Sequence, residues 1–133
     1  SFAGLLAGGE FTPNDAIFAE QTWHSQYRPI RSVRTHRHKL IQRFAEFPEN
    51  VLPEDFYETC AAADALRHHF DRTPPARLEF YDLAQDPLAV RPVVAATAAD
   101  LPEPGRQLYQ RLHEWMVQTN DPLLDGPVPA PQT

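Results

Sequence analysis

Fourteen prolines in a chain of 133 residues limit how long any helix or strand can be. This is about twice the average proline usage. Proline removes a backbone donor and interrupts helices and central strands. The prolines gather at positions 74–75, 102–104 and 127–131. We therefore expect short elements joined by stiff loops, with residues 125–133 forming a disordered tail.

Two runs of residues in the first third of the chain predict an antiparallel hairpin. Residues 30–35 form a β-like segment in which each face mixes apolar and polar side chains, and residues 39–44 form a second strand after a turn at His36 and Arg37. Further strands are expected at residues 14–20 and 78–83. The stretch from 22 to 29 has no clean period and is predicted to be a loop.

A helix is predicted at residues 104–120, because Leu108, Leu112, Trp115 and Met116 follow one another at helical spacing along one face. A second helix is expected from about residue 52 to residue 70, where proline and acidic residues mark its first turn. The fold class that this pattern indicates is α+β. We expect a small antiparallel sheet of about four strands, with the C-terminal helix packed on one face.

Composition excludes several function classes. The net charge of −6 and the pI near 5.4 argue against a nucleic-acid partner. No apolar run approaches the roughly 20 residues that cross a bilayer, so we expect no membrane insertion. The single cysteine, Cys60, rules out an internal disulfide framework. The lack of an N-glycosylation sequon and the many Ala, Arg and Pro residues favour a bacterial source.

Five landmarks, in this order, resemble the C-terminal subdomain of a type I, formylglycine-dependent sulfatase. They are Ser1-Phe2 with Leu5-Leu6 and Gly8; Phe18-Ala19-Glu20; Arg31-x-x-Arg34-Thr-x-Arg37-x-Lys39-x-Ile41; Phe80-Tyr-Asp-Leu-x-x-Asp86-Pro87; and Trp115-Met116-x-x-Thr119-x-Asp121-Pro122-Leu123-Leu124. The run Glu20-x-Thr22-x-His24-x-x-Tyr27-x-Pro29 is similar to the heparan N-sulfatase (sulfamidase) branch. The sequence departs from the pattern at His38, where the family has an aromatic residue.

The resemblance implies that the catalytic groups lie in a different domain from this chain. Residues 1–13 would be the end of the large catalytic domain or a connector, and residues 14–124 the C-terminal subdomain. The nucleophile and the Ca²⁺ ligands would lie in an N-terminal domain of the same polypeptide. Cys60 is followed by Asp64 where the nucleophile signature needs arginine. We therefore expect no catalytic residue, no metal site and no cofactor in this chain, which would not turn over substrate alone.

The substrate-binding candidates are Glu20, His24, Tyr27 and Arg28, which follow the first predicted strand. In the family this region faces the active-site cleft. A carboxylate can accept hydrogen bonds from sugar hydroxyls or an amino group, and an imidazole or guanidinium can hold a sulfate. The resemblance thus implies a sulfated small molecule or sugar as ligand. The alternative is structural, with Glu20 paired to Arg31 or Arg34 while Trp23 and Tyr27 simply pack.

Other readings stay open. Arg31, Arg34, Arg37 and Lys39 are predicted to be structural. His36 with His38, and His68 with His69, lack the further ligands that zinc needs, so surface or packing histidines are favoured. The parent enzyme could be a related phosphatase or phosphonate hydrolase of the alkaline phosphatase superfamily. The chain could also be a free-standing binding module.

Overall fold

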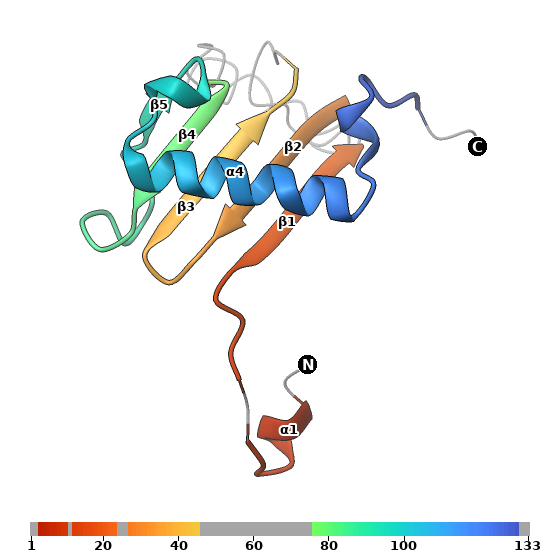
Figure 1. Cartoon of the computed structure of the whole chain (residues 1–133). Coiled ribbons are helices and arrows are strands. Elements are labelled where there is room, and N and C mark those ends of the chain that lie inside the picture. Colours follow the sequence, from red (N-terminus) through yellow and green to blue (C-terminus); the bar gives the residue numbers. More distant parts are fainter. Residues whose placement is uncertain (1–2, 11, 24–26, 46–75, 131–133) are drawn as a thin grey trace, which may run out of the picture.

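The computed structural model describes residues 3–10, 12–23, 27–45 and 76–130 (Figure 1). The helix predicted at 52–70 and its Cys60 lie outside these residues. The described elements, in chain order, are α1 (Ala3–Leu6), β1 (Ile17–Trp23), β2 (Tyr27–Arg34), β3 (His38–Arg43), β4 (Leu78–Asp82), β5 (Val93–Ala95), the 3₁₀ helix η1 (Ala98–Asp100), α4 (Glu103–Gln118) and the 3₁₀ helix η2 (Pro122–Leu124).

Five strands form one antiparallel sheet in the order β1-β2-β3-β4-β5. The predicted hairpin is present, with Val33 opposite Leu40. Thr35 closes its turn, because its backbone N–H donates to the His38 carbonyl at 2.8 Å and its hydroxyl accepts the His38 N–H at 3.0 Å. The predicted class, a small antiparallel sheet with a C-terminal helix on one face, is confirmed.

Two strand boundaries differ from the sequence prediction. Residues 22–29 were predicted to be a loop, but β1 extends to Trp23 and β2 begins at Tyr27. The two aromatic rings pair across the strands, with centroids 5.0 Å apart, and such cross-strand pairs stabilise a sheet without a regular polarity pattern. The three-residue strand β5 was also not predicted, because it is short and lies in a stretch rich in Ala and Pro.

Helix α4 crosses one face of the sheet (Figure 1). The buried residues of its stripe, Leu108, Leu112 and Met116, join the core formed by Val33 and Leu40 with other sheet residues. Trp115 lies at the edge of this core and stacks on Phe18 of β1, with centroids 4.9 Å apart. The predicted apolar stripe is therefore the packing face of the helix.

A glycine in the first turns of α4 lets the helix approach the sheet closely. A Cβ atom at Gly105 would lie 3.2 Å from the Phe80 ring and 3.2 Å from the Leu101 Cβ. This is tighter than ordinary van der Waals contact. The absence of a side chain at Gly105 thus sets the distance between the start of α4 and strand β4.

The end of α4 is a Schellman motif with asparagine at the left-handed position. Asn120 has φ 52°, and its N–H donates to the Val117 carbonyl at 3.2 Å. The Asp121 N–H donates to the Met116 carbonyl at 2.9 Å. Asparagine is one of the few residues besides glycine that adopts this conformation readily. The motif reverses the chain and directs Asp121 back toward the sheet.

The N-terminal helix α1 has no buried residue. Its Leu5 and Leu6 are exposed, and the segment lies apart from the sheet in Figure 1. Within the described part of the chain, no helix combines the length and the apolar character needed to cross a membrane.

Candidate functional site

A surface hollow of roughly 600 Å³ lies where β1 ends, next to the segment that follows α4. It is lined by Glu20, Gln21, Thr22, Trp23, Arg31, Pro122, Val128 and Pro129. We call it the Trp23 hollow. It lies in the region that the sequence indicated, and Glu20 is the substrate-binding candidate that lines it.

Glu20 presents an accessible carboxylate. Its side chain is 64% exposed, and its nearest cation is the Arg31 Nε, at 3.8 Å. An ion pair at this distance is longer than a hydrogen bond. The expected pairing of Glu20 with Arg31 is therefore present but loose, and the carboxylate oxygens remain able to accept hydrogen bonds from a ligand.

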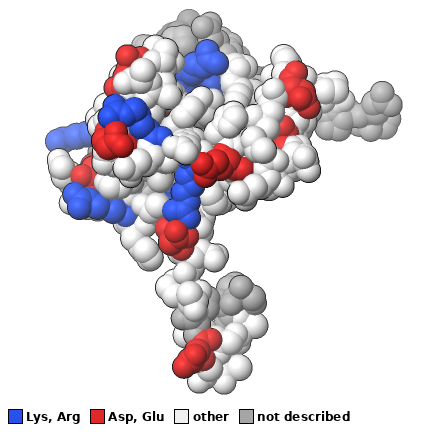
Figure 2. All heavy atoms as spheres, in the orientation of Figure 1, with Lys and Arg blue, Asp and Glu red and all other residues white. Residues whose placement is uncertain are grey.

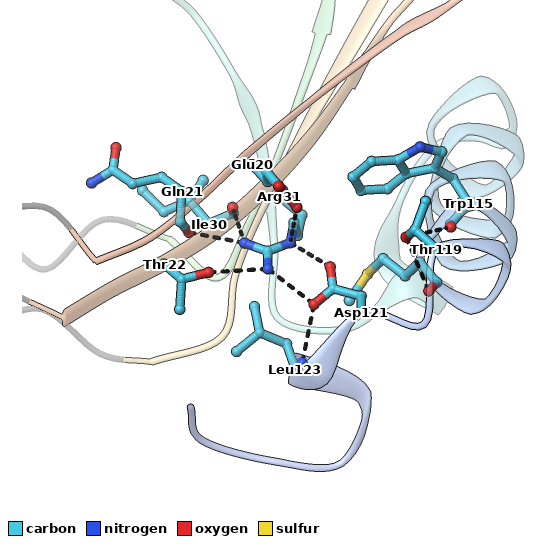
Figure 3. A network of polar contacts seen from close by, with 10 residues as sticks. Glu20, Gln21, Thr22, Ile30, Arg31, Trp115, Thr119, Asp121 and Leu123 are labelled. Carbon is cyan, nitrogen blue, oxygen red and sulfur yellow. Dashed lines mark hydrogen bonds and ion pairs between the residues drawn. The ribbon is translucent and has the colours of Figure 1, made fainter. Parts of the chain in front are cut away.

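Arg31 is committed to the fold (Figure 3). Its guanidinium is 2% exposed and forms an ion pair with Asp121. Two N–H groups donate to that carboxylate, two donate to the carbonyls of Gln21 at 2.9 Å and Ile30 at 3.0 Å, and one donates to the Thr22 hydroxyl at 3.1 Å. A guanidinium has five N–H donors, and all five are used, so Arg31 has none left for an anionic ligand.

The charge of Asp121 is stabilised in this network. Desolvation by burial opposes ionisation, but the hydrogen bonds from Arg31 and from the Leu123 N–H, together with the Arg31 charge, hold the pKa of Asp121 below its ordinary value. The Leu123 N–H donates to Asp121 at 3.0 Å and caps η2. Arg31 and Asp121 thereby fix the wall of the Trp23 hollow that follows α4.

Trp23 and Tyr27 bind the backbone of Val128 on both sides. The Trp23 Nε1–H donates to the Val128 carbonyl at 3.2 Å, and the Val128 N–H donates to the Tyr27 hydroxyl at 3.1 Å. This part of the proline-rich tail therefore lies against the sheet. The Tyr27 hydroxyl acts here as an acceptor and keeps its own proton for a further partner.

Of the three sequence candidates that the structure describes, only Glu20 lines the Trp23 hollow. Glu20 lines the hollow, and Tyr27 supports it through Val128. Arg28 is half-buried and is not among the residues of the hollow. Side chains alternate along a strand, so Arg28 and Arg31 lie on opposite faces of β2. His24 lies outside the described residues.

Two contributors to the hollow were missed from the sequence, namely the ring of Trp23 as a binding surface and the tail residue Val128. Tryptophan and tyrosine usually find a hydrogen-bond partner when they are partly buried. That general rule indicated that a partner existed. It did not identify a backbone group 105 residues away along the chain.

In the described ranges of the chain, no three His, Cys, Asp or Glu side chains are grouped so that they could hold a metal ion. His38 packs against Phe80, with ring centroids 5.4 Å apart, and His36 is exposed. His68 and His69 lie outside the described residues. The residues that line the Trp23 hollow offer polar groups beside the rings of Trp23, Pro122 and Pro129.

Comparison with models of known protein families, and with curated proteins, found no match for this chain.

Proposed function

We propose that the chain is the C-terminal subdomain of a sulfatase and forms one wall of the substrate cleft. The observation that carries the proposal is the exposed Glu20 carboxylate beside the Trp23 ring in a hollow of roughly 600 Å³. The sequence motifs add support, because Arg31, Ile41 and Phe80 lie on three adjacent strands, β2, β3 and β4.

The proposed role is to bind and orient the substrate. An indole ring offers an apolar surface for the face of a sugar ring, and the Glu20 carboxylate can accept hydrogen bonds from hydroxyl or amino groups. In the proposal the parent enzyme hydrolyses a sulfate ester or sulfamate. Its N-terminal domain supplies the formylglycine nucleophile and the Ca²⁺ site. No step of that chemistry is assigned to the residues of this chain.

The first test of the proposal is the activity of the chain alone. We expect the purified 133-residue chain to give no release of sulfate from an aryl sulfate or a sulfated amino sugar. Turnover that follows the chain through purification would contradict the proposal, because it would place a nucleophile within these residues.

Substitution of Glu20 in the parent enzyme tests the binding role. Glu20→Gln removes a charged acceptor that contacts substrate in both ground state and transition state, so we expect KM to rise about tenfold with little change in kcat. Glu114→Gln is the control, because Glu114 is exposed on α4 away from the hollow. A fall in kcat at unchanged KM would assign Glu20 to the reaction instead, and no effect on either constant would remove it from the cleft.

A second candidate function is a free-standing binding module. It is favoured by one observation: β1, β2 and the segment after α4, which are far apart in the sequence, together line the Trp23 hollow. Saturable binding of an amino sugar to the isolated chain, lost in Glu20→Gln, would favour the module. If the parent enzyme is instead a related phosphatase or phosphonate hydrolase, the nucleophile motif of its N-terminal domain will distinguish it from a sulfatase.

A further inference from the structure

A second hollow of roughly 630 Å³ lies beside the start of α4. Phe80, Val93, Pro102 and Pro104 form its apolar part, and Arg37 and Arg91 stand at its rim. We call it the Arg91 hollow. It borders the β2–β3 turn, whereas the Trp23 hollow borders the β1–β2 connection, so the two lie at opposite ends of the strands. Its size is in the range of small-molecule pockets.

Backbone hydrogen bonds fix the segments that carry the two arginines. The Leu83 N–H donates to the Arg37 carbonyl at 2.7 Å and ties the β2–β3 turn to the end of β4. The Arg91 N–H donates to the Asp86 carboxylate at 2.7 Å and closes the loop between β4 and β5. The rim is therefore built on a defined backbone.

Basic and acidic groups alternate around this hollow. Figure 2 shows blue and red side chains next to one another on the side where β5 and the start of α4 lie in Figure 1. The acids are Asp82 and Asp86, and the cations are Arg37 and Arg91. The two acids and two cations leave the rim close to neutral as a whole. A multiply charged anion would therefore gain little electrostatic stabilisation there, and a cation would be repelled by the two guanidiniums.

The two arginines leave guanidinium donors unused at the rim, because a guanidinium has five N–H groups. Asp82 already accepts the Ala84 N–H at 3.0 Å and the Gln85 amide at 3.2 Å, and Asp86 accepts the Arg91 N–H. Arg37 has only a 3.6 Å contact with Asp82 and is 67% exposed. Among the described residues, the Arg91 guanidinium has no hydrogen-bond or ion-pair partner.

We propose that the Arg91 hollow binds a small organic monoanion, namely a carboxylate attached to an aromatic or branched aliphatic body. The planar carboxylate matches the fork of a guanidinium, and the body would cover Val93 and the two prolines. Val93 is 47% exposed without a ligand, so covering it removes apolar surface from water. The ligand is distinct from the sulfated substrate of the proposed parent enzyme, because the two hollows lie at opposite ends of the sheet.

The test is a titration of the full 133-residue chain, labelled with ¹⁵N, with benzoate followed by NMR. We expect saturable shifts of the Arg37 and Arg91 Nε–H signals and of the Val93 amide at ligand concentrations of about 1 to 20 mM. Inorganic phosphate and phenyl sulfate serve as comparison ligands. Phosphate should bind at least about tenfold more weakly, because it lacks an apolar body and carries more charge than the rim can balance.

Arg91→Gln should weaken benzoate binding by about tenfold or more, while Arg34→Gln, an exposed arginine outside this hollow, should leave it unchanged. Both side chains are exposed, so the amide spectra should stay those of the folded chain. Three outcomes would overturn the proposal: no saturable shift, equal losses in the two variants, or tighter binding of phosphate. Tighter binding of phenyl sulfate would assign the hollow to a sulfate ester and likewise reject the carboxylate.

Discussion

At the scale of single residues, each face of the sheet holds a charged network that is largely withdrawn from water. Arg31 and Asp121 pair on the α4 face. On the other face Arg43 lies 3.0 Å from Glu79, which also accepts the Tyr81 hydroxyl at 2.9 Å. Both networks lie within the fold, so these charged residues hold strands and segments together. They are not available to bind a substrate.

Removing Asp121 from its pair with Arg31 should strongly lower the stability of the protein. Asp121→Ala leaves the buried Arg31 charge unpaired, and we expect a loss of about 3–5 kcal/mol in the free energy of unfolding, measured by urea denaturation. Glu20→Ala removes only the exposed partner and should cost less than about 1 kcal/mol. Similar small losses in the two variants would show that the Arg31–Asp121 pair does not hold the C-terminal segment.

The direction of the Asp121 pKa shift determines how the stability from the Arg31–Asp121 pair depends on pH. The folded pKa of Asp121 lies below the ordinary value of 3.8. The stability it supplies is therefore present above about pH 4 and is lost as pH falls through the lowered pKa. Asp121→Asn, which does not titrate, should accordingly lose less stability than the wild type on acidification.

Tyr81 should titrate at unusually high pH. Burial, together with the hydrogen bond to Glu79 and the negative charge of Glu79, raises the pKa of its hydroxyl to about 12. A raised pKa means that the stability from neutral Tyr81 is present below pH 10 and is lost as pH rises toward 12. Absorbance of tyrosinate at 295 nm should show a component near pH 12 that Tyr81→Phe removes. An unchanged titration curve in that variant would contradict the assignment.

At the scale of elements, the local sequence pattern predicted two kinds of element. These are strands that pair with a neighbour close in sequence, and helices whose apolar periodicity extends over many residues. The hairpin β2–β3 followed from two strand-like runs on either side of a two-residue turn, and α4 followed from four apolar residues at helical spacing. Strand β5 and the end of β1 were missed because they depend on pairing with neighbouring strands. Tertiary contacts of this kind leave little trace in a short run of sequence.

In the candidate site too, the part encoded by local sequence was predicted and the part that depends on distant contacts was not. Glu20 was identified from a motif, and it is the exposed carboxylate of the Trp23 hollow. The opposite wall was not identified, because it depends on the reversal of the chain at Asn120, which brings Val128 back to Trp23. Asn120 is the residue that could have indicated this reversal, since it follows a helix and tolerates a positive φ.

The packing face of α4 gives a direct test at this scale. Leu112 is fully buried against the sheet, so Leu112→Ala should cost about 2–5 kcal/mol in the free energy of unfolding. Val117, which is 54% exposed on the same helix, is the matched control and should cost under about 1 kcal/mol when changed to alanine. Calorimetry or urea denaturation measures both, and equal losses would contradict the packing of α4 described above.

At the scale of the whole molecule, the Trp23 hollow and the Arg91 hollow lie near opposite ends of α4. The Trp23 hollow presents an acceptor and an aromatic ring, and the Arg91 hollow presents two guanidiniums beside an apolar surface. The proposed sulfatase role concerns the first hollow alone. Helix α1, with its exposed Leu5 and Leu6, would contact the N-terminal domain in that proposal.

The central claim is that these residues are the substrate-shaping end of a larger sulfatase. The most direct measurement is the intact mass and peptide map of the native gene product that contains them. We predict a product several-fold longer than this chain. Upstream of these residues it should hold a Cys-x-Pro/Ala-x-Arg or Ser-type peptide with the mass change of formylglycine conversion. A native product that contains only these residues would contradict it and leave the binding module as the function.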